Sequence, residues 1–205
     1  EKVKAMSYLL AEGHLKNGYV LFSNKDENLM NDFKQAVERM GKGLEAKPHG
    51  EGSVRVVDLN LRREVSGERN EKGQFTSKTV FEKKHVLRKF LEEQGMYDHL
   101  SSTKYIPNAI YKLPKHKLAL FLNRLFSCDG SIFKVGKQYW MISYSSVSKK
   151  LIQGVQHLLH RFGIIARCRT KRTTSKLGTA YELEVHGEHV HQYLQERGIF
   201  GAQEH

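Results

Sequence analysis

The sequence has few cysteines and no long hydrophobic run, and each absence excludes a class of protein. Its 205 residues include only two cysteines, Cys128 and Cys168. Two thiols alone cannot make a four-ligand zinc site, and they fit a reducing compartment better than a disulfide framework. No run reaches the roughly 18 consecutive apolar residues of a membrane span, and no signal-peptide cleavage site follows the start. Glycine-rich phosphate loops are also missing, so a nucleotide-hydrolysing motor is not supported.

Acidic residues are scarce in the second half of the chain. The whole sequence has 34 Lys and Arg against 22 Asp and Glu, a formal net charge of +12. Residues 1–100 carry 18 basic and 16 acidic side chains, whereas residues 101–205 carry 16 and 6. A positive field of this kind attracts polyanions, and nucleic acids are the commonest polyanions in a cell. A solubility surface or an anionic membrane partner remains open at this stage.

The spacing of apolar residues indicates an internal repeat. One helix-like set recurs 122 residues later: Leu29, Phe33, Ala36, Val37 and Met40 correspond to Leu151, Val155, Leu158, Leu159 and Phe162. Two further helix-like runs, residues 5–13 and 122–130, each end in an acid and a glycine and are offset by 117. The difference of five residues falls between these helices. It predicts a hairpin with a longer tip in the second copy, because loop length is easily varied.

Alternation of apolar and polar residues predicts strands after the second helix of each copy. Residues 53–63 place Val57, Leu59 and Leu61 on one face, and residues 180–186 place Tyr181, Leu183 and Val185 on one face. Closing helices are predicted at 81–95 and 188–198, and the polar residues 65–74 predict a surface loop. The sequence therefore predicts an α+β fold of tandem pseudo-twofold α-β-β-α-β-β-α repeats. These repeats, 1–100 and 101–205, are expected to form one pseudo-symmetric body with two antiparallel sheets.

Two acids occupy matching places in the repeats. Glu12 and Asp129 each end an apolar helix, so they converge if the repeats pack about an axis through those helices. Paired carboxylates repel unless a cation lies between them, and such a pair suits Mg²⁺, which prefers oxygen ligands. Bound ions could activate a water and stabilise the leaving oxygen of a phosphodiester. Either acid alone would be interpreted as an exposed helix end, but their equivalence favours a shared site.

The two runs AMSYLLAEG and LNRLFSCDG resemble the two motif helices of the LAGLIDADG homing endonucleases in their single-chain form. The segment Lys104-Tyr105-Ile106-Pro107 is similar to the Lys-x-Ile-Pro block that precedes the second motif in endonucleases carried by inteins, with those of bacterial replicative DNA helicases as the nearest resemblance. Together the repeat, the acids and the intervening pattern cover nearly the whole chain. Each piece alone is weakly specific, and the combination carries the resemblance.

The resemblance implies a fold and a site. Two sheets would form a DNA-binding saddle, and Glu12 and Asp129 would bind Mg²⁺ or another divalent cation such as Mn²⁺. The backbone carbonyls of Ala11 and Cys128 would assist, and Lys104 would lie near the scissile phosphate, where a cation offsets developing negative charge. This sequence departs from the family pattern in two ways: its first acid is Glu, and Arg124 stands where a small residue usually lets the helices approach.

Basic residues on the predicted strands are candidates for DNA contact in the major groove. The densest set lies within residues 165–176: Arg167, Arg169 and Lys171 share one face by period two, followed by Arg172 and Lys176. The alternative interpretation is a solvated edge strand whose charges prevent aggregation. Further candidate contacts are Lys16, Tyr19, Arg55 and Arg62 in the first copy and Lys134, Lys137 and Tyr139 in the second.

The sequence thus predicts a monomeric, metal-dependent DNA endonuclease that cuts one phosphodiester per strand of a long, asymmetric double-stranded target. The resemblance implies cuts across the minor groove that leave short 3′ overhangs. We expect a cytoplasmic protein, associated with the nucleoid when bound to DNA, without an obligate protein partner or a membrane. Self-splicing is not expected, because the chain starts without a nucleophile and ends without a His-Asn pair. The alternatives are a non-cleaving DNA- or RNA-binding protein, such as a maturase or a regulator, and a basic scaffold domain.

Overall fold

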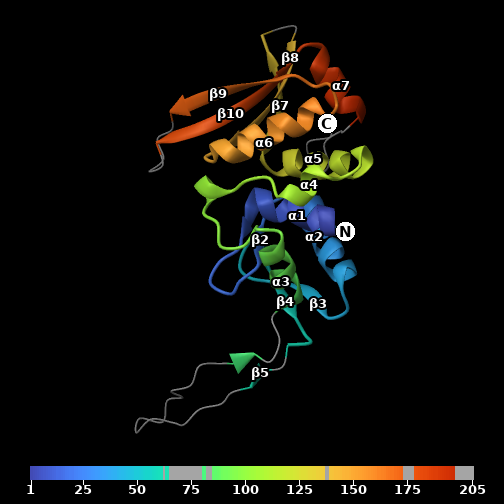
Figure 1. Ribbon diagram of the computed structural model, residues 1–205, viewed down its shortest axis with the longest axis vertical. Coiled ribbons are helices and arrows are strands. Elements are labelled where there is room, and N and C mark those ends of the chain that lie inside the picture. Colours follow the sequence, from blue (N-terminus) through green and yellow to red (C-terminus); the bar gives the residue numbers. More distant parts are fainter. Residues whose placement is uncertain (62, 65–79, 82–84, 137–138, 173–177, 197–205) are drawn as a thin grey trace.

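The two halves of the chain build two similar layers around a central pair of helices (Figure 1). The computed structural model describes residues 1–61, 63–64, 80–81, 85–136, 139–172 and 178–196. Helices α1 (Lys2–Glu12) and α5 (Lys115–Asp129) lie in the middle, and a four-stranded antiparallel sheet lies toward each end of the molecule. The predicted α+β class is therefore confirmed. The expected surface loop at residues 65–74 falls outside the described residues.

The two sheets have equivalent strand orders, as expected for an internal repeat. The first half contains β1 (Gly13–His14), β2 (Leu21–Ser23), α2 (Glu27–Met40), β3 (Leu44–Pro48), β4 (Ser53–Asp58), β5 (Arg63–Glu64), β6 (Val80–Phe81) and α3 (Val86–Glu93). The second contains a 3-10 turn (Ser101–Thr103), α4 (Asn108–Tyr111), β7 (Gly130–Val135), β8 (Tyr139–Ser146), α6 (Lys149–His160), β9 (Ala166–Arg172), β10 (Thr179–His186) and α7 (Glu188–Glu196). The orders are β1-β2-β4-β3 and β7-β8-β10-β9, and β5 pairs with β6 separately.

Helices α2 and α6 form because an amphipathic pattern follows a capping residue. Asp26 accepts hydrogen bonds from the first turn of α2, and Ser148 accepts one from Leu151 in α6. These side chains satisfy backbone donors that a helix start leaves without partners. The predicted apolar residues of both helices are buried, except for the half-buried Met40. Burying each Leu or Phe contributes about 1.5–3 kcal/mol, so these faces anchor the helices to their sheets.

The first hairpins differ in strand length, so the prediction of a longer tip in the second copy is wrong. Gly13 pairs with Phe22 and Gly130 pairs with Tyr144, which are equivalent positions. In the second copy pairing continues as far as Val135 and Tyr139, whereas β1 and β2 share only two pairs and are joined by residues 15–20. The five additional residues therefore lengthen the paired strands.

The predicted face of residues 53–63 is also wrong, because β4 ends at Asp58 and buries the other set of residues. Val54 and Val56 face the core, while Leu59 is 55% exposed. Asp58 ends the strand by accepting hydrogen bonds from the backbone of Asn60 and of Val86, both at 3.0 Å. The second contact fixes the start of α3, which begins later than the predicted residue 81. In β10 the predicted face is correct, since Leu183 and Val185 are fully buried.

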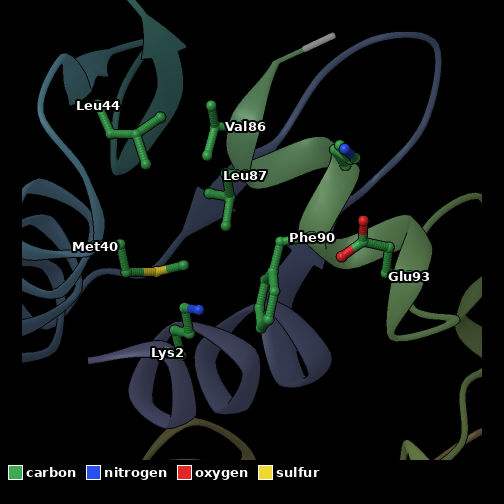
Figure 2. A pocket seen from close by; sticks show the side chains of 8 residues that line it. Lys2, Met40, Leu44, Val86, Leu87, Phe90 and Glu93 are labelled. Carbon is green, nitrogen blue, oxygen red and sulfur yellow. The ribbon is translucent and has the colours of Figure 1, made fainter.

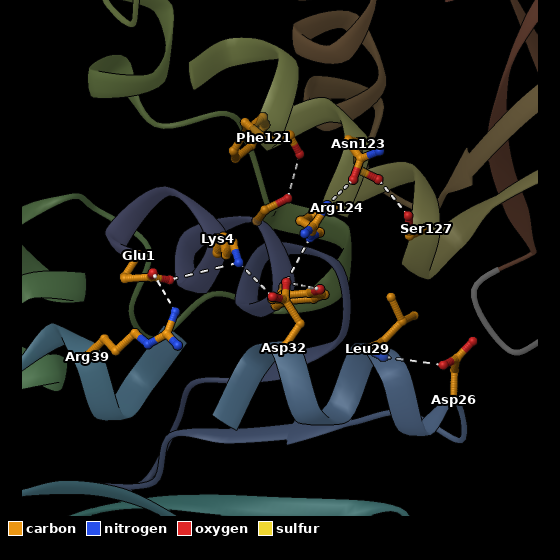
Figure 3. A network of polar contacts seen from close by, with 12 residues as sticks. Glu1, Lys4, Asp26, Leu29, Asp32, Arg39, Phe121, Asn123, Arg124 and Ser127 are labelled. Carbon is orange, nitrogen blue, oxygen red and sulfur yellow. Dashed lines mark hydrogen bonds and ion pairs between the residues drawn. The ribbon is translucent and has the colours of Figure 1, made fainter. Parts of the chain in front are cut away.

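The central helices α1 and α5 pack along each other through small and apolar side chains. The Ser7 hydroxyl donates a 2.6 Å hydrogen bond to the Phe121 carbonyl across this contact. Arg124 points out of it toward Asp32 on α2, with Nε 2.8 Å from the carboxylate (Figure 3). The arginine therefore leaves room for the helices to approach. Within the described part of the chain, no helix is both long and apolar enough to cross a lipid bilayer.

Candidate active site

The two acids lie where the paired helices end and the sheets begin. Glu12 is the last residue of α1 and Asp129 the last residue of α5, and Gly13 and Gly130 begin β1 and β7. A Cβ atom on either glycine would collide with the helix carbonyl of Leu9 or Phe126. Only glycine therefore lets the chain pass directly from helix to strand. This junction holds each carboxylate at the same end of the helix pair.

The Glu12 carboxyl lies in a partly buried, negatively charged environment. Burial raises its pKa above the ordinary value, and the nearby charge of Asp129 raises it further. Two contacts oppose this shift: the Asn24 amide donates a hydrogen bond to Oε2, and the Lys104 ammonium favours the charged form. The influence of Asp129 on the pKa of Glu12 shows that the two carboxyls are electrostatic neighbours.

Asp129 is exposed at the end of α5, whereas Glu12 is half-buried, but neighbouring protein atoms still shield the Asp129 carboxyl from part of the solvent. Burial raises its pKa, while the charge of Lys104 and a contact with Tyr144 lower it. The Tyr144 hydroxyl lies 3.5 Å from Oδ2 of Asp129. Tyr144 itself is fully buried, and both burial and the nearby carboxylate raise its pKa. The phenol therefore stays protonated and can donate to the carboxylate.

Lys104 brings a cation to the two acids from a separate segment. Its Nζ donates hydrogen bonds to the carbonyls of Ala11, at 2.8 Å, and Gly13, at 3.4 Å. Burial lowers the pKa of the ammonium, and the charges of Asp129 and Glu12 raise it. The Ser148 hydroxyl holds the backbone of the lysine by donating to its carbonyl at 2.5 Å. The structure thus brings together Glu12 and Asp129, as the repeat predicted, and Lys104, which the resemblance to the family had placed at the same site.

The donor atoms at this site fit a hard divalent cation. Two carboxylates with raised pKa values lie together, and a cation between them would relieve their repulsion. Among the described residues, no group of three or more His, Cys, Asp or Glu side chains could hold a metal ion. Burial and the neighbouring acids raise the pKa of the Cys128 thiol, so the thiol is protonated in the metal-free protein. A sparse oxygen donor set suits Mg²⁺, which keeps several waters.

The predicted basic residues of the second sheet do not all share one face. Cross-strand pairing places Arg167, Arg169 and Lys171 on the side of the sheet that none of the described helices covers, and Tyr139 lies on the same side. Lys134 pairs with Trp140 on the opposite side, with its ammonium 5.2 Å from the indole centre. Arg172 ends β9 and is exposed. Since β9 is an edge strand, a role in preventing aggregation remains compatible with these charges.

The first sheet places a smaller basic group on its uncovered side. Arg55 lies there beside Lys47, its cross-strand partner, and its guanidinium stacks over the Tyr19 ring at 4.4 Å. Tyr19 and Lys16 come from the loop between β1 and β2. Three further predicted contacts, Arg62, Lys137 and Lys176, fall outside the described residues.

A separate pocket between α1, α2 and α3 lies among apolar side chains, including Met40 and Phe90 (Figure 2). The Lys2 ammonium lies 5.3 Å from the centre of the Phe90 ring. Neither Glu12 nor Asp129 lines this pocket. It is therefore distinct from the paired carboxylates.

Sequence reasoning missed the side chains that orient the acids. Asn24 contacts Glu12, Tyr144 contacts Asp129, and Ser148 holds Lys104. One signal was available: Tyr144 occupies the position that Phe22 occupies in the first repeat, so a hydroxyl is added to an otherwise apolar site. The spacing of Asn24 and Ser148 gave no comparable signal.

Comparisons with known proteins agree with this architecture. Residues 116–198 match the family described as LAGLIDADG-like domain. The homing endonuclease I-DmoI in complex with DNA and Mn has a similar structure, with a TM-score of 0.58, 12% identity, and coverage of 96% of this chain and 94% of that one. The homing endonuclease I-WcaI bound to its DNA recognition sequence has a TM-score of 0.57 and 12% identity, with coverage of 98% of this chain and 83% of that one. Full-length DUF199/WhiA from Thermatoga maritima has a TM-score of 0.53 and 11% identity, with coverage of 98% of this chain and 57% of that one.

The sequence relatives include replicative helicases and a replication factor subunit. The chain is 32% identical to replicative DNA helicase DnaB of Synechocystis over 108 residues, which is 52% of this chain and 12% of that protein. It is 30% identical to DnaB of Rhodothermus marinus over 60% of this chain and 13% of that protein. The replication factor C small subunit of Methanocaldococcus jannaschii is 25% identical over 83% of this chain and 8% of that protein. The chain therefore spans about an eighth or less of these relatives.

Proposed function

We propose that the protein is a site-specific, metal-dependent DNA endonuclease. Residues 116–198 match the LAGLIDADG-like domain family, and the chain has the fold of the LAGLIDADG homing endonucleases. Its substrate would be a long, asymmetric double-stranded DNA target, cut once in each strand by hydrolysis. The observation that carries this proposal is the meeting of Glu12, Asp129 and Lys104 where the helix pair ends.

A divalent cation held by Glu12 and Asp129 would lower the pKa of a water and offset negative charge on the phosphate. The backbone carbonyls of Ala11 and Cys128 are the further ligands we propose. Asn24 and Tyr144 would orient the two carboxylates through their hydrogen bonds. Lys104 would favour the ionised form of both acids and stabilise negative charge that develops on the phosphoryl oxygens. Its position is set by Ser148 and by the carbonyl of Ala11.

The uncovered faces of the two sheets are the proposed DNA surface. They carry Arg55 and Lys47 in the first repeat and Arg167, Arg169 and Lys171 in the second. The two faces differ in sequence, so they would read two different half-sites. One chain supplies both acids, and we propose that it acts as a monomer, in the cytoplasm, where it would reach chromosomal DNA.

The pattern of relatives supports an origin as an inserted element. Replicative helicases, DNA gyrase, replication factor C and the helicase Hel308 all share a segment with this chain, although they are different kinds of protein. In each of them the match is 13% of the length or less. A mobile segment carried by different hosts explains this distribution, and we propose that the chain is an intein-type endonuclease domain.

The decisive experiment is cleavage of a mixed DNA library by the purified protein in Mg²⁺ and in EDTA, with sequencing of the new ends. We expect metal-dependent ends around one asymmetric sequence, with short 3′ overhangs, that disappear in Glu12→Ala. If salt-sensitive binding to one sequence persists without ends, the protein is a non-cleaving binding protein instead. If neither binding nor cleavage is found, the basic scaffold interpretation replaces both.

A further inference from the structure

Two carboxylates lie on the most basic surface of the molecule. Glu182 and Glu184 on β10 are cross-strand partners of Arg169 and Arg167 on β9, so all four side chains lie on the uncovered side of the second sheet. Glu184 is only 2% exposed, although that side is not covered by any helix that the structure describes. A carboxylate there repels DNA phosphates and costs free energy when desolvated, unless its partners offset both effects.

The partners of Glu184 are specific. Its Oε1 lies 2.5 Å from Nη2 of Arg169, and its Oε2 lies 3.2 Å from Nε2 of His186. Arg169 reaches diagonally across the strands to make this contact, and it lies 3.9 Å from Glu182 as well. Arg167 is the direct cross-strand partner of Glu184, yet no ion pair joins it to another described residue. Within the described part of the chain, one arginine of the row is therefore held by an ion pair and its neighbour is not.

The held guanidinium still has donors to offer. Arginine has five N–H donors in a rigid fork, and Arg169 contacts both acids through Nη2. Its side chain is 51% exposed, so the rest of the fork can meet a ligand. The matching acceptor pair in the major groove is O6 and N7 of guanine, which arginine contacts in a bidentate manner. Holding the Arg169 guanidinium in place before DNA binds lowers the conformational entropy that is lost when it contacts the base.

We propose that Glu184 is a positioning residue that holds Arg169 to recognise one guanine in the half-site bound by the second repeat. The inference rests on the proposed DNA-binding function. It separates two roles within one strand, since Arg169 would select a base while Arg167 would contribute positive charge without base preference.

The test is selection of bound DNA from a random library in EDTA, so that cleavage is not required. Wild type should enrich guanine at one position of the target. Glu184→Gln and Arg169→Lys should both lower that preference about tenfold at the same base pair, and the matched control Arg167→Lys should leave it in place. Removing an acid should at the same time tighten binding to unrelated DNA, because repulsion of phosphates is relieved.

The outcomes separate this inference from the function on which it rests. If Glu184→Gln tightens binding to every sequence and leaves the guanine preference intact, Glu184 does not position a reading residue and the inference fails. If thermal unfolding shows that Glu184→Gln is not folded, the test rests on Arg169→Lys. A guanine preference that is retained in Arg169→Lys overturns the inference. A wild-type protein that enriches no sequence overturns the proposed function together with this inference.

Discussion

At the residue scale, the proposed site depends on three charged groups whose pKa values are shifted by burial and by one another. Glu12 and Asp129 have raised pKa values, and the charge of Lys104 limits the rise of both. Only the ionised carboxylates bind a cation well. Cleavage is therefore expected to be lost on acidification at a higher pH than ordinary carboxyl groups would give.

Lys104→Met should shift this acid limit further upward. Without the ammonium, the pKa of each carboxyl rises, so a smaller fraction of both is ionised at a given pH. The measurement is the pH profile of the cleavage rate at fixed Mg²⁺ for wild type and the variant. Lys134→Met serves as the control, because this lysine packs against Trp140 and its charge does not shift the pKa of either acid. An unchanged acid limit in Lys104→Met would contradict the proposed coupling.

At the element scale, one hydroxyl connects a helix start to the site. Ser148 accepts a hydrogen bond from Leu151 in α6 and donates one to the Lys104 carbonyl. Asp26 occupies the equivalent place at the start of α2, where it accepts hydrogen bonds from Asn28 and Leu29. The two capping residues therefore have similar structural roles, but Ser148 also holds the segment that carries Lys104, the proposed catalytic lysine.

Ser148→Ala should lower both stability and activity. Loss of the cap should cost about 1 kcal/mol of unfolding free energy, and the freed Lys104 segment should lower the cleavage rate. Asp26→Ala should cost a similar amount of stability and leave the rate nearly unchanged. Thermal or denaturant unfolding combined with single-turnover cleavage checks both expectations. Equal rate losses in the two variants would show that the effect comes from stability alone.

The elements also show how far sequence could predict the structure. The helices were found because apolar residues at helical spacing and matching acids recur in both repeats. The strand at residues 53–63 was placed on the wrong face because Val56 and Val57 are both apolar, so alternation gave no unique choice. Its end depends on Asp58, whose partners Asn60 and Val86 are brought together only by folding. The five-residue difference between the two copies likewise could not show whether the second hairpin has a longer tip or longer strands.

At the scale of the whole molecule, a charged cluster around Asp32 joins the two repeats. Asp32 contacts Lys4 at 2.6 Å, Tyr8 at 2.8 Å and Arg124 at 2.8 Å (Figure 3). The position equivalent to Asp32 in the second repeat is Gly154, which packs tightly against Ile106 and Tyr111. Sequence reasoning could not predict this cluster, because its members come from different repeats and have no charged counterparts.

Asp32→Asn should destabilise the fold in a pH-dependent manner. Burial alone would raise the pKa of Asp32, but hydrogen bonds from Lys4, Arg124 and Tyr8 outweigh it and lower the pKa. The charged form therefore contributes stability above the unfolded pKa of about 3.9, and that contribution is lost as pH falls through the lower folded pKa. We expect a loss of about 3 kcal/mol at pH 7 that shrinks in acid.

Unfolding free energies at several pH values check this prediction. The exposed pair of Arg39 and Glu1 provides a control, since Arg39→Ala should cost less than about 1 kcal/mol. A loss in Asp32→Asn that stays constant from pH 7 to strongly acidic pH would contradict the role assigned to the charged cluster.

The central claim is that Glu12 and Asp129 together form the centre of a DNA endonuclease. The most direct measurement is single-turnover cleavage and equilibrium binding of the selected target by wild type and Asp129→Asn, which keeps the side-chain shape. We predict that the variant binds the target with nearly unchanged affinity and loses cleavage by at least about a hundredfold. Full cleavage by Asp129→Asn would contradict this claim.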